Sequence, residues 1–357
     1  MTSECSLLEQ TLAANLSWNR ARIKFLSRFL LALCAARTVN LTRIAVLFAG
    51  RAKIQSNYKR IKRFLAFFEI EAAELAGLLV KLMSLPPPFI LCIDRTEWQL
   101  GKKWVNVLML SVVWEGVAIP IVWTVFEKKG CSSDAERQAI VEKYLQIFGG
   151  ETICFVTADR EFASREWLQY LSGKRIDFVL RIKSSALITD KRGKQMRASK
   201  LLQGTPLGAK LICRRRRKMC GVAVSIAGMR KADGDNVIVI SSLESADTAL
   251  SNYCLRWQIE TLFGCLKTRG FNLEETHVTA PERVWRLVAL LALGFRWALL
   301  TGKVVCERKA LRTKKHGRLE QSVFRAGLDY LGHLFGRPGG EGQKQERQQL
   351  ILLLYRS

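Results

Sequence analysis

The sequence predicts an α/β protein in which buried strands alternate with helices. Residues 89–93 and 152–158 are continuous apolar runs, as expected of strands that are buried on both faces. Residues 104–113 and 117–126 are separated by a short glycine-bearing turn, which predicts a β-hairpin. Strands mixed with helices in this way form a sheet with helices on its faces.

Amphipathic helices are expected between these strands. Residues 133–148 begin with Ser and Asp as capping residues and end before two glycines. Ser164 is positioned to cap a second helix at residues 165–171, and residues 176–182 have the apolar character of a further strand. The order strand, hairpin, helix, strand, helix, strand is that of a ribonuclease-H-like α/β core with a mixed sheet.

Two aspartates directly follow the predicted central strands. Asp94 comes after residues 89–93, and Asp159 comes after residues 152–158. Ligands of open α/β sheets bind beyond the carboxyl ends of the strands, so both aspartates are candidate site residues. Acids are also common at strand ends without any such role, and position alone leaves that alternative open.

Changes in composition divide the chain into five parts. The three prolines at 86–88 end an N-terminal helical pattern. Residues 186–231 contain 13 Lys and Arg against one acid, a density that favours contact with phosphates over an ordinary solvated loop. The expected parts are a helical DNA-binding domain at 1–85, the first part of the core at 86–182, a basic β-rich insertion at 183–247, the completion of the core with a catalytic helix at 248–302, and a basic helical C-terminal region at 303–357.

The charge of the chain points to a polyanionic partner. The 357 residues carry a net charge of +26, which opposes folding and indicates nucleic acid as the partner. Ten scattered cysteines form no CxxC pair, as expected in a reducing compartment, so we expect a cytoplasmic protein without a zinc site. Residues 287–300 are apolar but too short to span a bilayer and include Arg296, which predicts a buried core helix and no membrane partner.

The N-terminal part contains a candidate helix-turn-helix. Residues 41–50 and 53–68 read as two helices joined by a glycine-bearing turn, and the first turns of the second helix are polar and basic. We expect Lys59, Arg60 and Arg63 to contact DNA. An ordinary helical hairpin with a basic face is the alternative.

Residues 251–270 are expected to form the helix around which the site is organised. At 100° per residue, Tyr253, Arg256, Glu260 and Lys267 fall in one stripe, beside a face of apolar residues. A solvated face carrying a Glu–Arg pair is the simpler interpretation of such a stripe. The fixed spacing Tyr-x2-Arg-x3-Glu-x6-Lys favours a functional one.

This spacing resembles the YREK signature of bacterial insertion-sequence transposases of the DDE type (the insertion sequence four family). The surroundings of the two aspartates also resemble that family, with Asp94 in Asp-Arg-Thr-x-Trp and Asp159 in Asp-Arg-Glu. The resemblance implies that Asp94, Asp159 and Glu260 are the catalytic acids and hold two Mg²⁺ ions, with Mn²⁺ able to substitute. Carboxylates that hold two divalent ions about 4 Å apart can align a nucleophile and stabilise a reacting phosphate.

The same resemblance implies cut-and-paste transposition. The partners would be double-stranded DNA, as terminal inverted repeats and as target, bound by a homodimer at the nucleoid of a bacterium. The implied DNA contacts are Tyr253, Arg256, Lys267 and Arg160, and Arg160 and Glu161 are also expected to support the site. Trp257 could stack on a base or pack in the core.

One departure from the family leaves a hairpin intermediate in doubt. No aromatic residue occurs between Phe178 and Tyr253, so the insertion cannot supply the ring on which such enzymes stack a flipped base, and Trp98 or Phe162 would have to do so. Two alternatives stay open: a catalytically inactive, sequence-specific DNA-binding regulator on the same fold, and a junction-resolving or repair nuclease.

Overall fold

The computed structural model describes residues 2–48, 50–233, 235–315, 317, 319–336 and 340–355. A central mixed sheet runs through it in the order β3-β2-β1-β4-β5-β11-β10-β8, with β9 paired to β10. The first five strands are β1 (Phe89–Leu100), β2 (Lys103–Trp114), β3 (Val117–Phe126), β4 (Ile153–Ala158) and β5 (Phe178–Arg181). β2 is antiparallel to both β1 and β3, whereas β4 runs parallel to β1 and β5 runs parallel to β4.

The predicted hairpin between β2 and β3 is confirmed. Its two turn residues, Glu115 and Gly116, both have positive φ angles, of 44° and 84°. Paired positive φ angles produce the twist that matches the flanking strands, and glycine adopts such an angle without steric cost.

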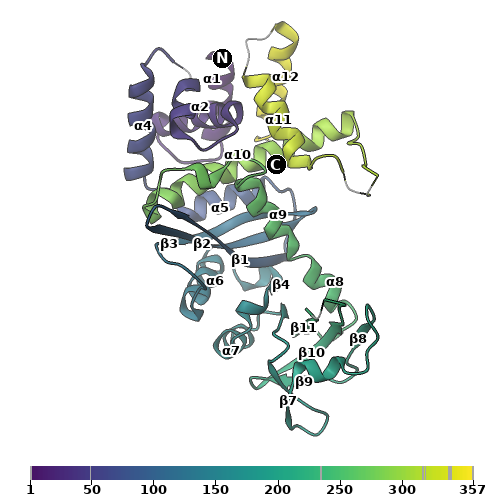
Figure 1. The fold of residues 1–357 in the computed structure, drawn as a ribbon. Helices are drawn as coiled ribbons and strands as arrows, with labels where there is room; N and C mark the ends of the chain where they lie inside the picture. Colours follow the sequence, from purple (N-terminus) through teal and green to yellow (C-terminus); the bar gives the residue numbers. More distant parts are fainter. Residues whose placement is uncertain are drawn as a thin grey trace.

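Helices cover both faces of the sheet (Figure 1). On one face lie α6 (Asp134–Phe148) and α7 (Arg165–Gly173), and on the other lie α5 (Ala72–Lys81), α9 (Trp257–Leu266) and α10 (Pro281–Arg308). Ser133 and Glu136 form a reciprocal capping box at the start of α6, and the Ser164 hydroxyl caps α7. The predicted α/β class and these two helix starts are therefore confirmed.

The region between β5 and the helices of the site is rich in strands, as predicted. It contains β6 (Leu187–Thr189), β7 (Gln195–Arg197), β8 (Lys210–Ile212), β9 (Arg217–Met219), β10 (Val222–Met229) and β11 (Val237–Ser241). β11 pairs antiparallel with β5, so this region extends the central sheet at one end of the molecule (Figure 1).

The N-terminal and C-terminal helices pack together at the opposite end (Figure 1). They are α1 (Thr2–Ala13), α2 (Arg20–Ala36), α3 (Leu41–Leu47), α4 (Ile54–Phe67), α11 (Val323–Phe335) and α12 (Glu341–Leu352). The buried Trp297 of α10 donates a hydrogen bond from its indole nitrogen to the Leu350 carbonyl (2.8 Å), which ties α12 to the core.

The predicted core helix at residues 287–300 is confirmed as part of α10, which continues beyond Leu300 to Arg308. α10 has 28 residues, starting at Pro281, and is long and apolar enough to cross a membrane. Its apolar window is 78% buried inside the protein, as in the core helix of a globular domain. α2 and α3, which are bent by 108° relative to each other, are together also long and apolar enough to cross a membrane.

Candidate active site

Asp94 and Asp159 lie where β1 and β4 part. The parallel pairing of these strands ends at Cys92 and Thr157, two residues before each aspartate. The prediction that the first strand stops at Asp94 was wrong, because antiparallel pairing with β2 carries β1 on to Leu100. Asp159 directly follows β4, as predicted. Both carboxylates therefore emerge from the same edge of the parallel pair.

The predicted helix at residues 251–270 is divided in the structure. α8 (Ala249–Cys254) and α9 are joined by a tight turn, in which the Arg256 N–H donates to the Tyr253 carbonyl three residues back (3.0 Å). α9 ends at Leu266 because the chain folds back there: a Cβ on Gly270 would lie 2.1 Å from the Cys265 carbonyl oxygen. Lys267 therefore lies just beyond the helix.

The stripe on these helices faces the two aspartates and connects all three acids. Tyr253 donates a hydrogen bond from its hydroxyl to Asp159 Oδ1 (2.9 Å). Arg256 reaches Asp94 Oδ2 with Nη1 (3.3 Å) and Glu260 Oε1 with Nη2 (2.7 Å). The Arg256 side chain is only 5% exposed, which makes this pairing an interior feature of the site. We call Asp94, Asp159 and Glu260 the acid cluster.

Burial is the largest influence on the pKa of Asp94 and on the pKa values of the two side chains that bind the acids. It raises the pKa of Asp94 to about 7, against the backbone N–H of Arg95 and the charge of Arg256, which favour the carboxylate. Burial also raises the pKa of the Tyr253 hydroxyl to about 12, so it remains a hydrogen-bond donor. Burial lowers the pKa of Arg256, but Tyr253, Glu260 and Asp94 more than offset this effect, and the net shift is upward.

Arg95 of β1, the residue after Asp94, holds a network of charges beside the acid cluster. Arg95 pairs with Glu161 through Nε (3.1 Å) and with Glu97 through Nη1 (3.2 Å). Glu161 was predicted as a supporting residue, but Arg95 and Glu97 were missed. Their spacing of two residues places both on one face of a strand, which was a usable signal once the strand was known to continue past Asp94.

Three further residues were predicted to contact DNA near the site. Trp257 is 58% exposed, which excludes the alternative that it packs in the core, and it lies 5.2 Å from the Arg256 guanidinium. Lys267 is 2.7 Å from Glu274 and donates to the Glu97 carbonyl (3.2 Å). The Arg160 side chain pairs with Asp235 at 3.2 Å and, among the described residues, forms no hydrogen bond or ion pair with the acid cluster.

Two aromatic side chains considered for base stacking are inaccessible. Trp98 is 6% exposed and Phe162 is completely buried, so neither offers a free ring face to a nucleotide. Trp257 is the exposed tryptophan adjoining Arg256.

The predicted N-terminal helices are present as α3 and α4. Asn57 of α4 donates to the Ala45 and Phe48 carbonyls (both 3.4 Å), which fixes the turn between the two helices. Lys59, Arg60 and Arg63 are exposed on α4. Their contact with DNA stays a prediction.

The acid cluster has the donor chemistry of a divalent-metal site. Carboxylate oxygens are the ligands that Mg²⁺ prefers, and three acids from β1, the end of β4 and α9 suffice for it. Within the described ranges, however, no three acidic, histidine or cysteine side chains are grouped closely enough to hold an ion. Arg256 takes the position between Asp94 and Glu260 instead.

Comparison with known proteins identifies the family. Residues 86–294, more than half of the chain, match the model described as the transposase DDE domain. A similar solved structure is a cryo-EM structure of the piggyBac transposase synaptic complex with hairpin DNA, at 12% identity and a TM-score of 0.45, covering 94% of this chain and 76% of that one. No curated protein matches the chain.

The chain belongs to the transposase DDE-domain family. It is thus a transposase, an enzyme of the class that cleaves and transfers DNA strands.

Proposed function

We propose that this transposase moves an insertion sequence of the YREK-signature (insertion sequence four) family by cut-and-paste transposition. The observation that carries the proposal is the linkage of three acids by Tyr253 and Arg256, which are spaced as in that signature. The sheet order β3-β2-β1-β4-β5 supports a ribonuclease-H-like core. The substrates would be the terminal inverted repeats of the element and the target DNA.

Asp94, Asp159 and Glu260 would hold the catalytic metal, which we propose is a pair of Mg²⁺ ions with Mn²⁺ able to substitute. When bound, such ions polarise the reacting phosphate and activate the attacking water or 3′-hydroxyl. The protein contributes the positions of the carboxylates, the partial burial that strengthens their electrostatic interactions, and the hydrogen bond that orients Asp159.

Arg256 has two competing sets of partners in this scheme. Its guanidinium pairs with Asp94 and Glu260 in the protein alone, and its planar fork is equally suited to two oxygens of a phosphate. A DNA phosphate that engages Arg256 releases both carboxylates for metal. Because coupling between two binding equilibria is reciprocal, DNA and metal would then strengthen each other's binding.

The remaining contacts would guide DNA along the site. Trp257 offers an exposed ring for stacking on a base, and Lys267 and Arg160 offer cations to the neighbouring phosphates. We propose that the DNA complex contains two copies of the chain at the bacterial nucleoid. An inactive regulator on this fold would have no need of the acid cluster, which is complete here.

Strand cleavage tests the proposal directly. The substrate is a labelled duplex that carries the terminal repeats flanking the gene, incubated with Mg²⁺ or with EDTA. We expect Mg²⁺-dependent nicking at the repeat end, reduced by more than ~10²-fold in Glu260→Gln, because removal of even the partners of metal ligands costs about 10–100-fold.

Glu282→Gln on the exposed first turn of α10 is the matched control and should cleave normally. Tight binding of the repeat by the wild-type protein without cleavage in Mg²⁺ or Mn²⁺ would overturn the enzymatic proposal in favour of the regulator.

A further inference from the structure

A groove between α2 and α4 gathers positive charge without a matching acid. It has a volume of about 500 Å³ and lies on the N-terminal helices. Five of its seven lining residues are cationic and none is acidic. The lining consists of Ala21, Arg22, Lys24, Phe25, Arg28, Arg60 and Arg63. We call this site the α2–α4 groove.

The cations of the α2–α4 groove are not neutralised by the rest of the described chain. No ion pair of the described residues includes any of these five side chains, whereas Arg256 alone pairs with two acids. The Arg28 Nε is buried and has no hydrogen-bond partner in the part of the chain that the structure describes. Like charges gathered in this way repel one another, so an anionic ligand would stabilise the arrangement.

Aromatic packing holds part of the groove in place before any ligand binds. The rings of Phe25 and Phe64 stack at 4.1 Å between their centroids and join α2 to α4. The Arg22 guanidinium lies 4.9 Å from the Phe68 ring centroid and 5.9 Å from that of Phe64. These cation–π contacts restrict Arg22, which lowers the entropy lost when it binds a ligand.

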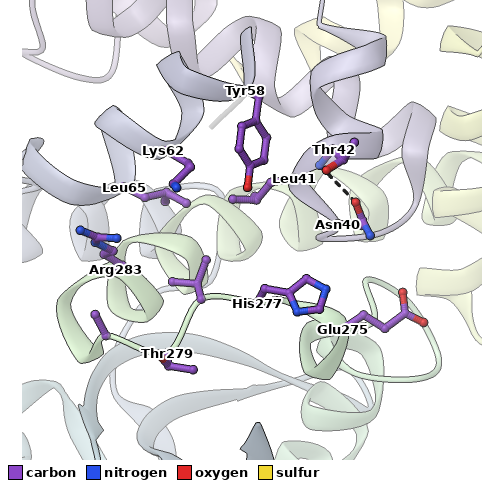
Figure 2. Close-up of a pocket in the computed structure, with 12 residues that line it drawn as sticks. Asn40, Leu41, Thr42, Tyr58, Lys62, Leu65, Glu275, His277, Thr279 and Arg283 are labelled. Carbon is purple, nitrogen blue, oxygen red and sulfur yellow. Dashed lines mark hydrogen bonds between the residues drawn. The ribbon is translucent and has the colours of Figure 1, made fainter. Parts of the chain in front are cut away.

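The two sides of α4 differ in charge. Tyr58 and Lys62 line a smaller pocket of about 210 Å³ opposite the segment that connects α9 to α10, with Arg283 nearby (Figure 2). That pocket also contains the carboxylate of Glu275, to which Thr38 donates a hydrogen bond (3.4 Å). An unopposed concentration of cations is therefore a property of the α2 side.

We propose that the α2–α4 groove binds the phosphate backbone of duplex DNA. The assignment rests on the proposed function in that DNA is the polyanion. The assignment also separates the three residues of α4 that were predicted to contact DNA, because Arg60 and Arg63 line the groove and Lys59 does not. The two arginines then contact phosphates together with residues of α2. Such contacts fix the position of the protein on DNA without reading its sequence.

The salt dependence of DNA binding tests the proposal. Affinity is measured between about 50 and about 200 mM salt, on a repeat-bearing duplex and on a mixed-sequence duplex, in EDTA so that no cleavage occurs. We expect Arg63→Gln and Arg28→Gln each to lower the magnitude of the slope of log affinity against log salt concentration by about 1. Each variant should lose the same factor of affinity for the two duplexes. Arg63 is exposed, so its variant remains informative if Arg28→Gln perturbs folding.

Lys344→Gln removes an equal charge at an exposed position of α12 and should leave the slope unchanged. An unchanged slope in both arginine variants would overturn the proposal, as would a loss confined to the repeat duplex, which indicates base reading. The DNA assignment would also be overturned if the wild-type protein bound a free nucleotide and the arginine variants lost this binding but kept normal DNA affinity. The outcome is independent of catalysis: a wild-type protein that cannot cleave can still show these slopes, and a groove variant with normal slopes can still cleave.

Discussion

The acid cluster and the α2–α4 groove both present arginine side chains to a proposed DNA substrate, but in opposite electrostatic settings. In the acid cluster, Arg256 faces Asp94 and Glu260 at 3.3 and 2.7 Å. The groove is lined by five cations and, among the described residues, by no acid. A ligand of the acid cluster must replace an internal partner, whereas a ligand of the groove neutralises a charge that is already unopposed.

This difference predicts an order of events on DNA. Unopposed cations attract a polyanion from solution and release counterions, so the groove should dominate initial binding and its dependence on salt. Paired cations change partners only when a phosphate arrives in the correct geometry, so the acid cluster should respond to the position of the DNA. Arginines of the groove would thus provide affinity for DNA, whereas Arg256 would let the catalytic site assemble only when DNA is correctly placed.

The largest expected effect is on the pH dependence of the free energy of unfolding, through Asp94 of the acid cluster. Burial raises the pKa of Asp94 from 3.8 to about 7, so the folded protein holds this proton more tightly than the unfolded chain does. The contribution of Asp94 to the free energy of unfolding therefore falls as pH rises from about 4 to about 7. Asp94→Asn cannot ionise. The free energy of unfolding of the variant should therefore rise relative to wild type over this pH range, by as much as a few kcal/mol.

Denaturant titrations of both proteins at several pH values, in EDTA, measure this difference. A difference that stays constant from pH 4 to pH 7 would contradict the account, because it would show that burial does not raise the pKa of Asp94 above its ordinary value.

A smaller effect is expected when the groove receives an acid of its own. Ala21→Glu places a carboxylate at the groove lining, in the first turn of α2. It should relieve repulsion between the cations and add about 0.2–1 kcal/mol to the free energy of unfolding, as exposed ion pairs do.

The same substitution should weaken DNA binding, because it makes the groove resemble the self-paired acid cluster. Ala21→Gln is the isosteric control, and chemical denaturation together with DNA titration checks both effects. Weaker binding in Ala21→Gln to the same extent would attribute the loss to bulk and not to charge.

Local patterns in the sequence were sufficient for much of the fold and for the residues of the acid cluster. The apolar runs predicted β1 and β4, and the hairpin and α6 were located from turn and capping residues. The spacing of Tyr253, Arg256 and Glu260 predicted a shared face, and the structure turns that face toward both aspartates.

The features that the sequence did not reveal depend on contacts between distant segments. β1 continues past Asp94 because of its pairing with β2, and this continuation brings Arg95 and Glu97 to the site. The basic residues of α2 had no evident meaning along the chain, since the groove exists only where α2 packs against Arg60 and Arg63 of α4. The tight turn between α8 and α9 likewise has no glycine or proline to signal it.

The measurement that tests the central claim most directly is Mn²⁺ binding to the protein without DNA, by electron paramagnetic resonance of the free ion. If the Arg256 guanidinium takes the place of a metal ion in the acid cluster, its removal should free the carboxylates. Arg256→Gln should then bind Mn²⁺ about 5–150-fold more tightly than wild type, which is the range of typical couplings between sites. The double variant Arg256→Gln with Asp159→Asn should lose this gain. Arg37→Gln, which breaks the ion pair between the end of α2 and Asp329 of α11, should behave as wild type. Equal Mn²⁺ affinity in wild type and Arg256→Gln, with both proteins folded, would contradict the account.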